Sequence, residues 1–363
     1  MKILITGGGT GGHIYPALSA AKKLEDEGGE VLYVGSRESL ESEIVTREEI
    51  SFQGISVAPL PRKINFSLFK AVLVSTAGFF QSLNIIRKFK PDVVFGTGGF
   101  VAGPVVLAGS ILGARTLIHE QNIYPGITNK LLSYVVDKIA LNFPGAIQYF
   151  PGRAQKKFVV TGNPVREKIM TARYKEGIKQ LNLDEHKKTV LAFGGSQGAE
   201  SINRAMGEVC RQLAGNKDIQ IIYITGQGKY DQVLESLGPV AESSNLHIKS
   251  YLHNIELAYA ASDLVVCRAG ATGLAEITVR GLPAILIPYP YASGNHQDFN
   301  ARFLEDNQAA LVISDSKLNG TLLLEKINKL LSDKNLLNKM AHNSKELGHP
   351  EALENIIEEI NNW

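Results

Sequence analysis

The N-terminus of this chain joins a short apolar segment, a run of glycines and a helix-like segment, and this combination restricts the fold more than any other feature. Residues 2–6 have the character of a short buried strand. Residues 7–12 are five glycines and one threonine, and Pro16 lies where the first turn of a helix is expected. A glycine-rich turn between strand and helix lets backbone amides approach a phosphate, and the helix N-terminus adds about half a positive charge. The pattern predicts an α/β fold that begins with a phosphate-binding loop.

The same pattern occurs twice more along the chain. Residues 96–103 are glycine-rich and follow an apolar strand-like segment, and residues 194–198 follow another. Three such loops predict phosphate groups on more than one ligand. His13, at the mouth of the first loop, is the best-placed candidate proton acceptor, because an imidazole with a pKa near 6.5 can accept a hydroxyl proton at neutral pH. The alternative role for His13 is a helix cap or a solvent-exposed side chain.

The length of 363 residues favours two domains. Strand-like segments alternate with helical patterns, which is typical of parallel α/β sheets; the expected strands are residues 3–6, 31–34, 93–95, 116–119, 138–140, 190–193, 220–224, 247–249, 264–267 and 284–287. A Gly-Asn-Pro linker candidate places the boundary near Gly162. We therefore expect two Rossmann-like, doubly wound parallel-sheet domains, residues 1–162 and 163–345, that face a cleft, and a C-terminal helix within residues 346–363 that packs back toward the first domain.

Charge and cysteine content limit the partners. Residues 51–163 hold 12 Lys and Arg against 3 Asp and Glu, although the whole chain has a net charge of only +2. Such a basic region suits a phosphorylated substrate, an anionic membrane or nucleic acid, and nucleic acid ranks last because aromatic-interleaved motifs are missing. Two cysteines, with no signal peptide expected, predict buried thiols in a cytosolic protein.

The segment from Phe66 to Lys90 is unusually apolar. Residues 71–86 carry no charge, and basic residues flank them on both sides. A buried Rossmann helix would explain the apolar centre but not the flanking charges. We therefore expect one face of this helix to touch an anionic bilayer, at about 1 kcal/mol for each basic residue near the surface.

Several polar residues follow predicted strands and are expected to line the cleft. Glu120 and Asn122 belong to the run His-Glu-Gln-Asn, and Glu276 lies shortly after a strand that runs into small residues. Thr272 resembles a helix N-cap in that segment. A carboxylate such as Glu276 could accept two hydrogen bonds from ribose hydroxyls. The alternative in each case is an exposed loop or surface side chain.

The first loop also matches the dinucleotide pattern Gly-x-Gly-x-x-Gly. The second predicted strand ends near Arg37, however, without the acidic residue that would hold a nicotinamide cofactor's ribose, so an NADP-binding oxidoreductase remains only a remote alternative. No two aspartates are separated by one residue, so the Asp-x-Asp metal motif is missing. We expect no metal and no cofactor.

Six motifs in order resemble the MurG family, the bacterial peptidoglycan N-acetylglucosaminyltransferases. They are the first glycine loop with His13, the loop at residues 96–104, residues 119–122, residues 162–166, residues 194–198 and residues 267–276. The resemblance implies a GT-B fold and metal-independent, inverting transfer of N-acetylglucosamine from UDP-GlcNAc to the C4 hydroxyl of undecaprenyl-diphospho-N-acetylmuramoyl-pentapeptide, which converts lipid I to lipid II. It also implies a peripheral position on the cytoplasmic side of the cell membrane, roles in cell shape and division, and other cell-wall synthesis proteins as partners.

The resemblance also implies site residues. His13 and Glu120 are the candidate bases. The expected UDP-GlcNAc contacts are Thr10, Gly11, Gly12, Asn122, Arg166, Ser196, Leu252, Ala271, Thr272, Gly273, Glu276 and Gln297. The expected contacts of the acceptor diphosphate are Gly9, Thr10, Gly98 and Gly99. Another GT-B glycosyltransferase, a UDP-sugar epimerase and a non-catalytic nucleotide-binding module remain as alternatives.

Overall fold

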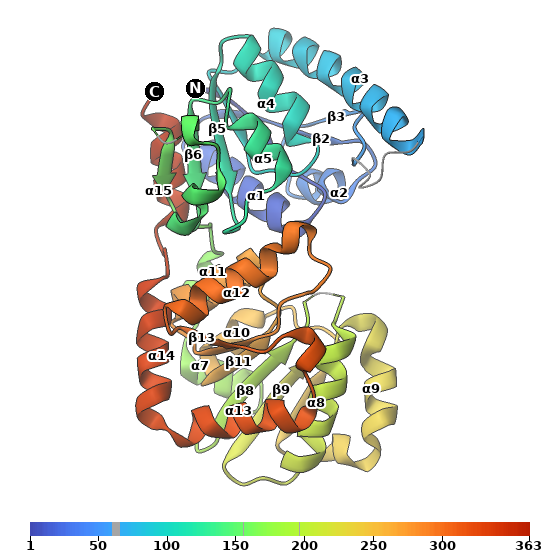
Figure 1. Cartoon of the computed structure of the whole chain (residues 1–363), viewed down its shortest axis with the longest axis vertical. Coiled ribbons are helices and arrows are strands. Elements are labelled where there is room, and N and C mark those ends of the chain that lie inside the picture. The colour runs from blue at the N-terminus through green and yellow to red at the C-terminus, as the bar shows by residue number, and fades with distance from the viewer. Residues whose placement is uncertain (60–65, 155, 196) are drawn as a thin grey trace. The chain divides into compact units, whose positions relative to one another are not determined.

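The chain folds into two compact units, which a computed structural model describes for residues 1–59, 66–154, 156–195 and 197–363. One unit combines Met1–Pro164 with Glu351–Trp363, and the other is Val165–Pro350 (Figure 1). The sequence analysis divided the chain at residues 162 and 345, whereas the structure divides it after Pro164 and Pro350. The prediction of two parallel-sheet α/β domains is confirmed.

The first unit is built on a parallel sheet that has seven strands in the part of the chain described, in the order β3-β2-β1-β4-β5-β6-β7. The strands are β1 (Lys2–Thr6), β2 (Glu30–Ser36), β3 (Phe52–Ile55), β4 (Val93–Gly96), β5 (Arg115–Glu120), β6 (Lys138–Leu141) and β7 (Phe158–Val160). The helices are α1 (Gly11–Asp26), α2 (Leu40–Arg47), α3 (Phe66–Phe89), α4 (Ala102–Ile111), α5 (Ile127–Leu132) and α15 (Ala352–Asn361), with 3-10 turns η1 (Pro144–Tyr149) and η2 (Gly152–Ala154).

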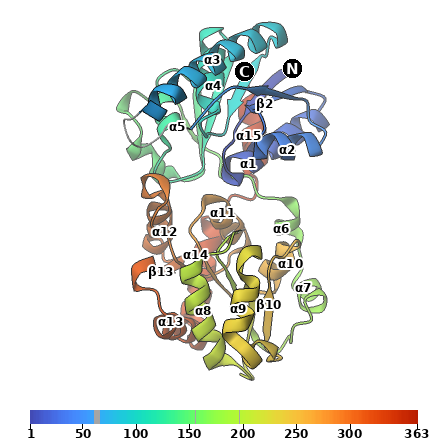
Figure 2. The ribbon, with the colours of Figure 1, turned by 90° about the vertical axis from the view of Figure 1, so that its right-hand side faces the viewer.

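Alternation along β1 explains how helices cover both faces of this sheet. Ile3 and Ile5 point into a core shared with α1, α2 and α15, whereas Leu4 points into a second core shared with α3, α4 and α5. Successive side chains of a strand point to opposite faces, so a fully apolar strand is buried on both sides. Figure 2 shows the two groups of helices on either side of the sheet.

Helix α15 belongs to the first unit although it ends the chain. Ile356, Ile357 and Ile360 lie in the same core as Ile3 and Ile5. The ammonium of Lys138 on β6 lies 2.7 Å from the Glu359 carboxylate, and Figure 1 shows α15 beside β6. The apolar stripe of α15 is therefore buried against the first unit. The rest of that unit ends at Pro164, about 190 positions before α15 begins.

The second unit repeats this plan. Within the described residues its parallel sheet has six strands in the order β10-β9-β8-β11-β12-β13. They are β8 (Lys188–Phe193), β9 (Ile219–Ile224), β10 (Leu246–Lys249), β11 (Leu264–Cys267), β12 (Ala284–Leu286) and β13 (Ala310–Val312). The helices are α6 (Glu167–Thr171), α7 (Tyr174–Gln180), α8 (Glu200–Leu213), α9 (Tyr230–Leu237), α10 (Ile255–Ala261), α11 (Ala271–Arg280), α12 (His296–Asp306), α13 (Gly320–Ser332) and α14 (Lys334–Glu346), with turns η3 (Gln227–Lys229), η4 (Gly238–Glu242), η5 (Ser293–Asn295) and η6 (Asp315–Lys317).

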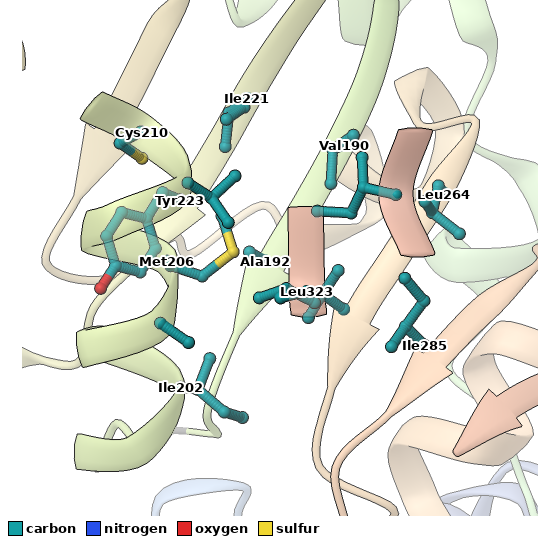
Figure 3. Packing of buried hydrophobic residues seen from close by; sticks show 14 of the residues in the cluster. Val190, Ala192, Ile202, Met206, Cys210, Ile221, Tyr223, Leu264, Ile285 and Leu323 are labelled. Carbon is teal, nitrogen blue, oxygen red and sulfur yellow. The ribbon is translucent and has the colours of Figure 1, made fainter. Parts of the chain in front are cut away.

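The core of the second unit follows from helical spacing in α8. Ile202, Met206 and Cys210 are four residues apart, so they share one face of the helix and pack toward β8 and β9 (Figure 3). Cys210 and Cys267 are both buried free thiols, as the sequence predicted. Burial raises the pKa of the Cys210 thiol to about 12, so it stays protonated at neutral pH.

Three strands and the first residue of one helix differ from those predicted from the sequence. All ten predicted strands are present, and β3, β7 and β13 are three further short strands that were not predicted. Strand β7 ends at Val160, just before the proposed Gly-Asn-Pro linker at residues 162–164. Helix α1 begins at Gly11, so Pro16 lies inside the helix and not in its first turn. At this position the proline nitrogen carries no hydrogen and cannot donate to the carbonyl of Gly12.

Candidate active site

Both units have the strand order of doubly wound sheets, and the predicted glycine loops lie at their switch points. In the first unit the order reverses between β1 and β4, and in the second between β8 and β11. Ligands of such sheets bind beyond the carboxyl ends of the strands at this point. The first two glycine loops follow β1 and β4, and the third follows β8.

The first two glycine loops pack directly against each other. A side chain on Gly99 would come within 2.2 Å of the Gly8 carbonyl oxygen, and Gly99 also has a φ of +82°. The Gly8 amide donates to the Gly98 carbonyl at 3.4 Å. Glycine is required here because the two backbones touch. The predicted acceptor-diphosphate residues are thus neighbours in the structure.

One amide of this loop is already bound to a carboxylate. The Gly9 amide donates to Oε2 of Glu41 at 3.3 Å, and Oε1 of the same buried side chain accepts from the amide of Ser36 at 3.2 Å. Position 41 on α2 belongs to no motif, so Glu41 was not among the residues predicted from the sequence. In this conformation the Gly9 amide is directed at Glu41, so the other loop amides remain the candidates for a phosphate.

His13 is fixed in the first turn of α1 by its Nδ1 atom. This nitrogen lies 3.0 Å from the carbonyl oxygen of Thr97 and 3.1 Å from Oε1 of Gln121. Both oxygens can only accept a hydrogen bond, so Nδ1 carries the proton. In the neutral ring the lone pair is therefore on Nε2, which makes Nε2 the basic nitrogen of the ring.

Glu120, the other candidate base, is buried and holds four hydrogen bonds. Its Oε1 accepts from the amide and side chain of Asn122 at 3.0 and 3.2 Å. Its Oε2 accepts from the Gly126 amide at 3.0 Å and from the Asn129 side chain at 2.8 Å. This side chain organises the loop between β5 and α5, because four donors converge on its two oxygens.

His119 is completely buried behind these residues. Its Nε2 lies 2.8 Å from the Gly162 carbonyl, and its Nδ1 lies 3.0 Å from the side-chain nitrogen of Gln121. Burial lowers the pKa of His119 to about 4, although the bond to Gly162 opposes this shift and the charge of His13 adds to it. His119 is therefore neutral at physiological pH.

This burial predicts a pH dependence of stability. The pKa of His119 is about 4 in the folded protein, below about 6.5 in an unfolded chain, so the unfolded state binds the extra proton between these values. The free energy of unfolding should decrease by up to about 1.4 kcal/mol per pH unit as the pH falls through this window. Denaturant unfolding of the wild type and of His119→Asn between pH 7 and pH 5 measures it. The variant should show the shallower slope, and parallel curves would contradict the prediction.

The second unit contains a cavity of about 780 Å³ at the carboxyl ends of its strands. The third glycine loop forms one wall, and Arg268, Gly270 and Gly273 at the β11–α11 connection form another. Tyr289, Tyr291 and Gln297 complete it. Gln297 is held by its Oε1, which accepts from the amide of Tyr289 at 2.9 Å. The cavity thus brings Gly273 and Gln297 of the predicted donor site together with the described residues of the third loop, which are Gly194, Gly195, Gln197 and Gly198. Ser196 lies outside the described residues.

Arg268 is a cavity residue that the sequence analysis did not assign. Its guanidinium donates to the carbonyls of Ile287 and Pro288 at 3.1 and 3.2 Å and to the hydroxyl of Ser201 at 3.0 Å. It also forms an ion pair with Asp315. One side chain therefore ties four segments together around the cavity. Its position directly after a predicted strand was the available signal.

Glu276 lies on α11 and is not among the residues that line the cavity. Its Oε1 accepts from the Arg166 guanidinium at 3.3 Å, and its Oε2 accepts from the hydroxyl of Tyr259 at 3.1 Å. Burial raises the pKa of Glu276, whereas Arg166 and Tyr259 lower it. Tyr259 was not predicted from the sequence.

The remaining donor-site residues occupy several places. Thr10, Gly11 and Gly12 lie with His13 at the start of α1, and Asn122 lies after β5. Leu252 lies in the turn after β10. Thr272 is not the N-cap of α11: Gly270 is, because the helix already begins at Ala271. The Thr272 hydroxyl is buried and has no hydrogen-bond partner among the described residues. Among the described residues there is no group of three His, Cys, Asp or Glu side chains that could hold a metal ion.

Two family models identify the class of protein as a glycosyltransferase. Residues 3–141 match the glycosyltransferase family 28 N-terminal domain, and residues 189–356 match the glycosyltransferase family 28 C-terminal domain. The crystal structure of MurG from Acinetobacter baumannii is 27% identical, with a TM-score of 0.81 over 100% of this chain and 99% of that chain.

Curated relatives define the family more narrowly. A protein of Halothermothrix orenii is 51% identical over 98% of this chain and 97% of its own length, and one of Desulforamulus reducens is 46% identical over 98% and 97%. Both are named UDP-N-acetylglucosamine--N-acetylmuramyl-(pentapeptide) pyrophosphoryl-undecaprenol N-acetylglucosamine transferase. The chain belongs to this family, the MurG glycosyltransferases.

Proposed function

We propose that this chain transfers N-acetylglucosamine from UDP-N-acetylglucosamine to the muramyl C4 hydroxyl of the undecaprenyl-diphosphate-linked pentapeptide, with inversion at the anomeric carbon. The names of the relatives support the two substrates. The structural observation that carries the chemistry is the fixed orientation of His13, whose Nδ1 is bound to the Thr97 carbonyl and to Gln121.

His13 acts as the general base in this proposal. The acceptor oxygen attacks C1 of the donor sugar, its proton passes to Nε2 of His13, and the bond between C1 and UDP breaks, with the electron pair leaving on UDP. Glu120 is the weaker candidate, because four hydrogen bonds already occupy its two oxygens. We assign Glu120 to holding the loop that carries Asn122.

The donor diphosphate binds at the third glycine loop, next to the cavity of the second unit. Amides of this loop and the guanidinium of Arg166 stabilise the charge that develops on UDP, and preorganised donors of this kind are commonly worth about 3–4 kcal/mol each in the transition state. Glu276 holds the ribose hydroxyls. The acceptor diphosphate binds at the loops that contain Thr10, Gly98 and Gly99. No metal is required in this scheme.

Product analysis tests this function. The purified enzyme would be incubated with UDP-N-acetylglucosamine and a short-chain lipid-linked muramyl pentapeptide, and the product examined by mass spectrometry and by NMR of the new anomeric proton. The expected product has gained one N-acetylhexosamine in β linkage. An α linkage would contradict inversion. Conversion of the donor to another UDP-sugar without acceptor would instead indicate an epimerase.

We also propose that α3 places the enzyme peripherally on the cytoplasmic face of the membrane. Among the described residues, Phe69–Phe89 is the one helix long and apolar enough to span a bilayer by length and composition. Phe69, Leu73 and Phe80 are 61%, 54% and 64% exposed. At 100° per residue they fall within about 40° of one another, so they form a single apolar stripe. Figure 2 shows α3 on the outside of α4.

Removing this stripe should weaken membrane binding. A Phe69→Ser and Phe80→Ser double variant should bind anionic vesicles at least about tenfold more weakly, because each buried aromatic side chain contributes about 1.5–3 kcal/mol. Activity on a short-chain soluble acceptor should be retained. Leu40→Ser with Ile147→Ser is the matched control, since these side chains are also exposed, at 50% and 37%, on other elements of the unit. Equal vesicle binding by the two double variants would contradict the proposal.

A further inference from the structure

Two buried side chains behind His13 have no role in the chemistry described so far. His119 lies in the buried strand β5 and is 0% exposed, and Gln121 follows two residues later at 1% exposed. Buried polar side chains are retained where each donor and acceptor has a partner. The partners of these two side chains form a continuous line to the proposed base.

The direction of each hydrogen bond in this line is fixed. The Gly162 carbonyl can only accept, so His119 donates from Nε2, at 2.8 Å. In the neutral ring Nδ1 of His119 then accepts, and it faces Nε2 of Gln121 at 3.0 Å. The same amide nitrogen donates to the Thr97 carbonyl at 2.8 Å. Two acceptors therefore surround the nitrogen of Gln121, and its Oε1 must point the other way, toward His13.

We propose that His119 and Gln121 are positioning residues that hold the Gln121 oxygen against Nδ1 of His13 and thereby keep the lone pair of His13 on Nε2. The inference rests on the proposed role of His13 as the base. No proton is transferred along these hydrogen bonds, because each donor keeps its hydrogen. Thr97 contributes a second acceptor to Nδ1, so loss of Gln121 weakens this orientation without abolishing it.

Neutrality of His119 is essential to this arrangement. A protonated His119 would present a donor at Nδ1, and Gln121 would have to rotate its amide so that the oxygen faced His119. The amide nitrogen would then meet the N–H of His13. Burial holds the pKa of His119 at about 4, which keeps the ring neutral under the conditions of the reaction.

Two variants of His119, each of which keeps one of the two hydrogen-bonding positions of the ring, separate positioning from a structural role. In His119→Asn the side-chain oxygen can replace Nδ1 and accept from Gln121, but the donor to Gly162 is lost. In His119→Gln the amide can replace Nε2 and donate to Gly162, but the acceptor for Gln121 is lost. We expect kcat of His119→Asn to stay within about threefold of wild type and kcat of His119→Gln to fall about tenfold or more, with donor KM unchanged.

A lower kcat for His119→Asn than for His119→Gln would overturn the proposal, because it would show that turnover depends on the hydrogen bond to Gly162 and not on the one to Gln121. Gln121→Met, which removes the same oxygen, should reproduce the loss of kcat seen in His119→Gln; normal turnover would also overturn it. His13→Ala separates the proposed base from the proposed positioning residues. Normal turnover of that variant rejects the base itself, whereas its loss together with a reversed His119 order rejects only the positioning.

NMR of the wild-type enzyme gives a test that needs no variant to fold. Ring nitrogen shifts of protein labelled with ¹⁵N-histidine distinguish the two neutral tautomers. We expect His13 protonated at Nδ1 and His119 protonated at Nε2 at pH 7. A His13 ring protonated at Nε2 alone, or a His119 ring protonated at Nδ1, would contradict the proposed arrangement.

Discussion

The His13→Ala variant is expected to lose at least about two orders of magnitude in kcat, which is the usual contribution of a positioned general base. The reason is geometric: Nδ1 is held by the Thr97 carbonyl and Gln121, so Nε2 is the basic atom. The imidazole binds no other part of the substrates in this account, so both KM values should change little. Steady-state kinetics with the lipid-linked acceptor would measure the effect.

Glu120→Gln is the informative companion to this variant. The substitution places an amide nitrogen where one oxygen now accepts two hydrogen bonds, so we expect lower stability and weaker donor binding. The pH dependence of kcat should keep its shape, because Glu120 is not the proton acceptor. If His13→Ala turned over near normally while Glu120→Gln lost the decrease of kcat at low pH that a catalytic base produces, the two roles would have to be exchanged.

The second large effect is expected at the ribose site. Glu276→Ala should raise the KM for UDP-N-acetylglucosamine about 100-fold, since two charge-assisted hydrogen bonds at about 1.5 kcal/mol each would be lost. The effect on kcat should be much smaller. In the structure each carboxylate oxygen has one protein donor, Arg166 or Tyr259, which leaves a second lone pair on each for a ribose hydroxyl.

A donor that lacks the ribose 2′-hydroxyl makes this test specific. The wild type should bind it more weakly than the natural donor, and Glu276→Ala should hardly distinguish the two. Glu256→Ala is the control, because this carboxylate lies close enough to Glu276 to raise its pKa but has no assigned contact. A collapse of kcat with unchanged KM would show that Glu276 acts in the chemical step and not on the ribose.

Most of the fold could be predicted because most of its strands contain short, continuous apolar runs that alternate with helical patterns. The buried strand β1 and the run from Val190 to Phe193 are continuous apolar segments, which parallel sheets require. Strand β3, with the sequence Phe-Gln-Gly-Ile, has neither length nor alternation, so it exists only through its pairing with β2. The start of α1 was misplaced because proline at position 16 is tolerated within the helix.

Site residues could be predicted where they belong to a sequence motif. They could not be predicted where only a tertiary contact brings them to the site. Glycine loops and His13 stand out in the sequence because few other roles require such a run. Glu41, Arg268 and Tyr259 contribute through contacts that include Gly9, Asp315 and Glu276, which are 32, 47 and 17 positions away. Such pairings depend on the tertiary fold, and no local pattern indicates them. The line from His119 to His13 likewise spans 106 positions and becomes visible only in three dimensions.

Release of UDP from UDP-N-acetylglucosamine, with and without the lipid-linked muramyl pentapeptide and in the presence of EDTA, tests the central claim most directly. We expect release that requires the acceptor and continues in EDTA, because side chains and backbone amides supply the stabilisation of the leaving group. Release that appeared only after magnesium was added would contradict the metal-free mechanism. Absence of acceptor-dependent release even with magnesium would contradict the proposed transfer reaction itself.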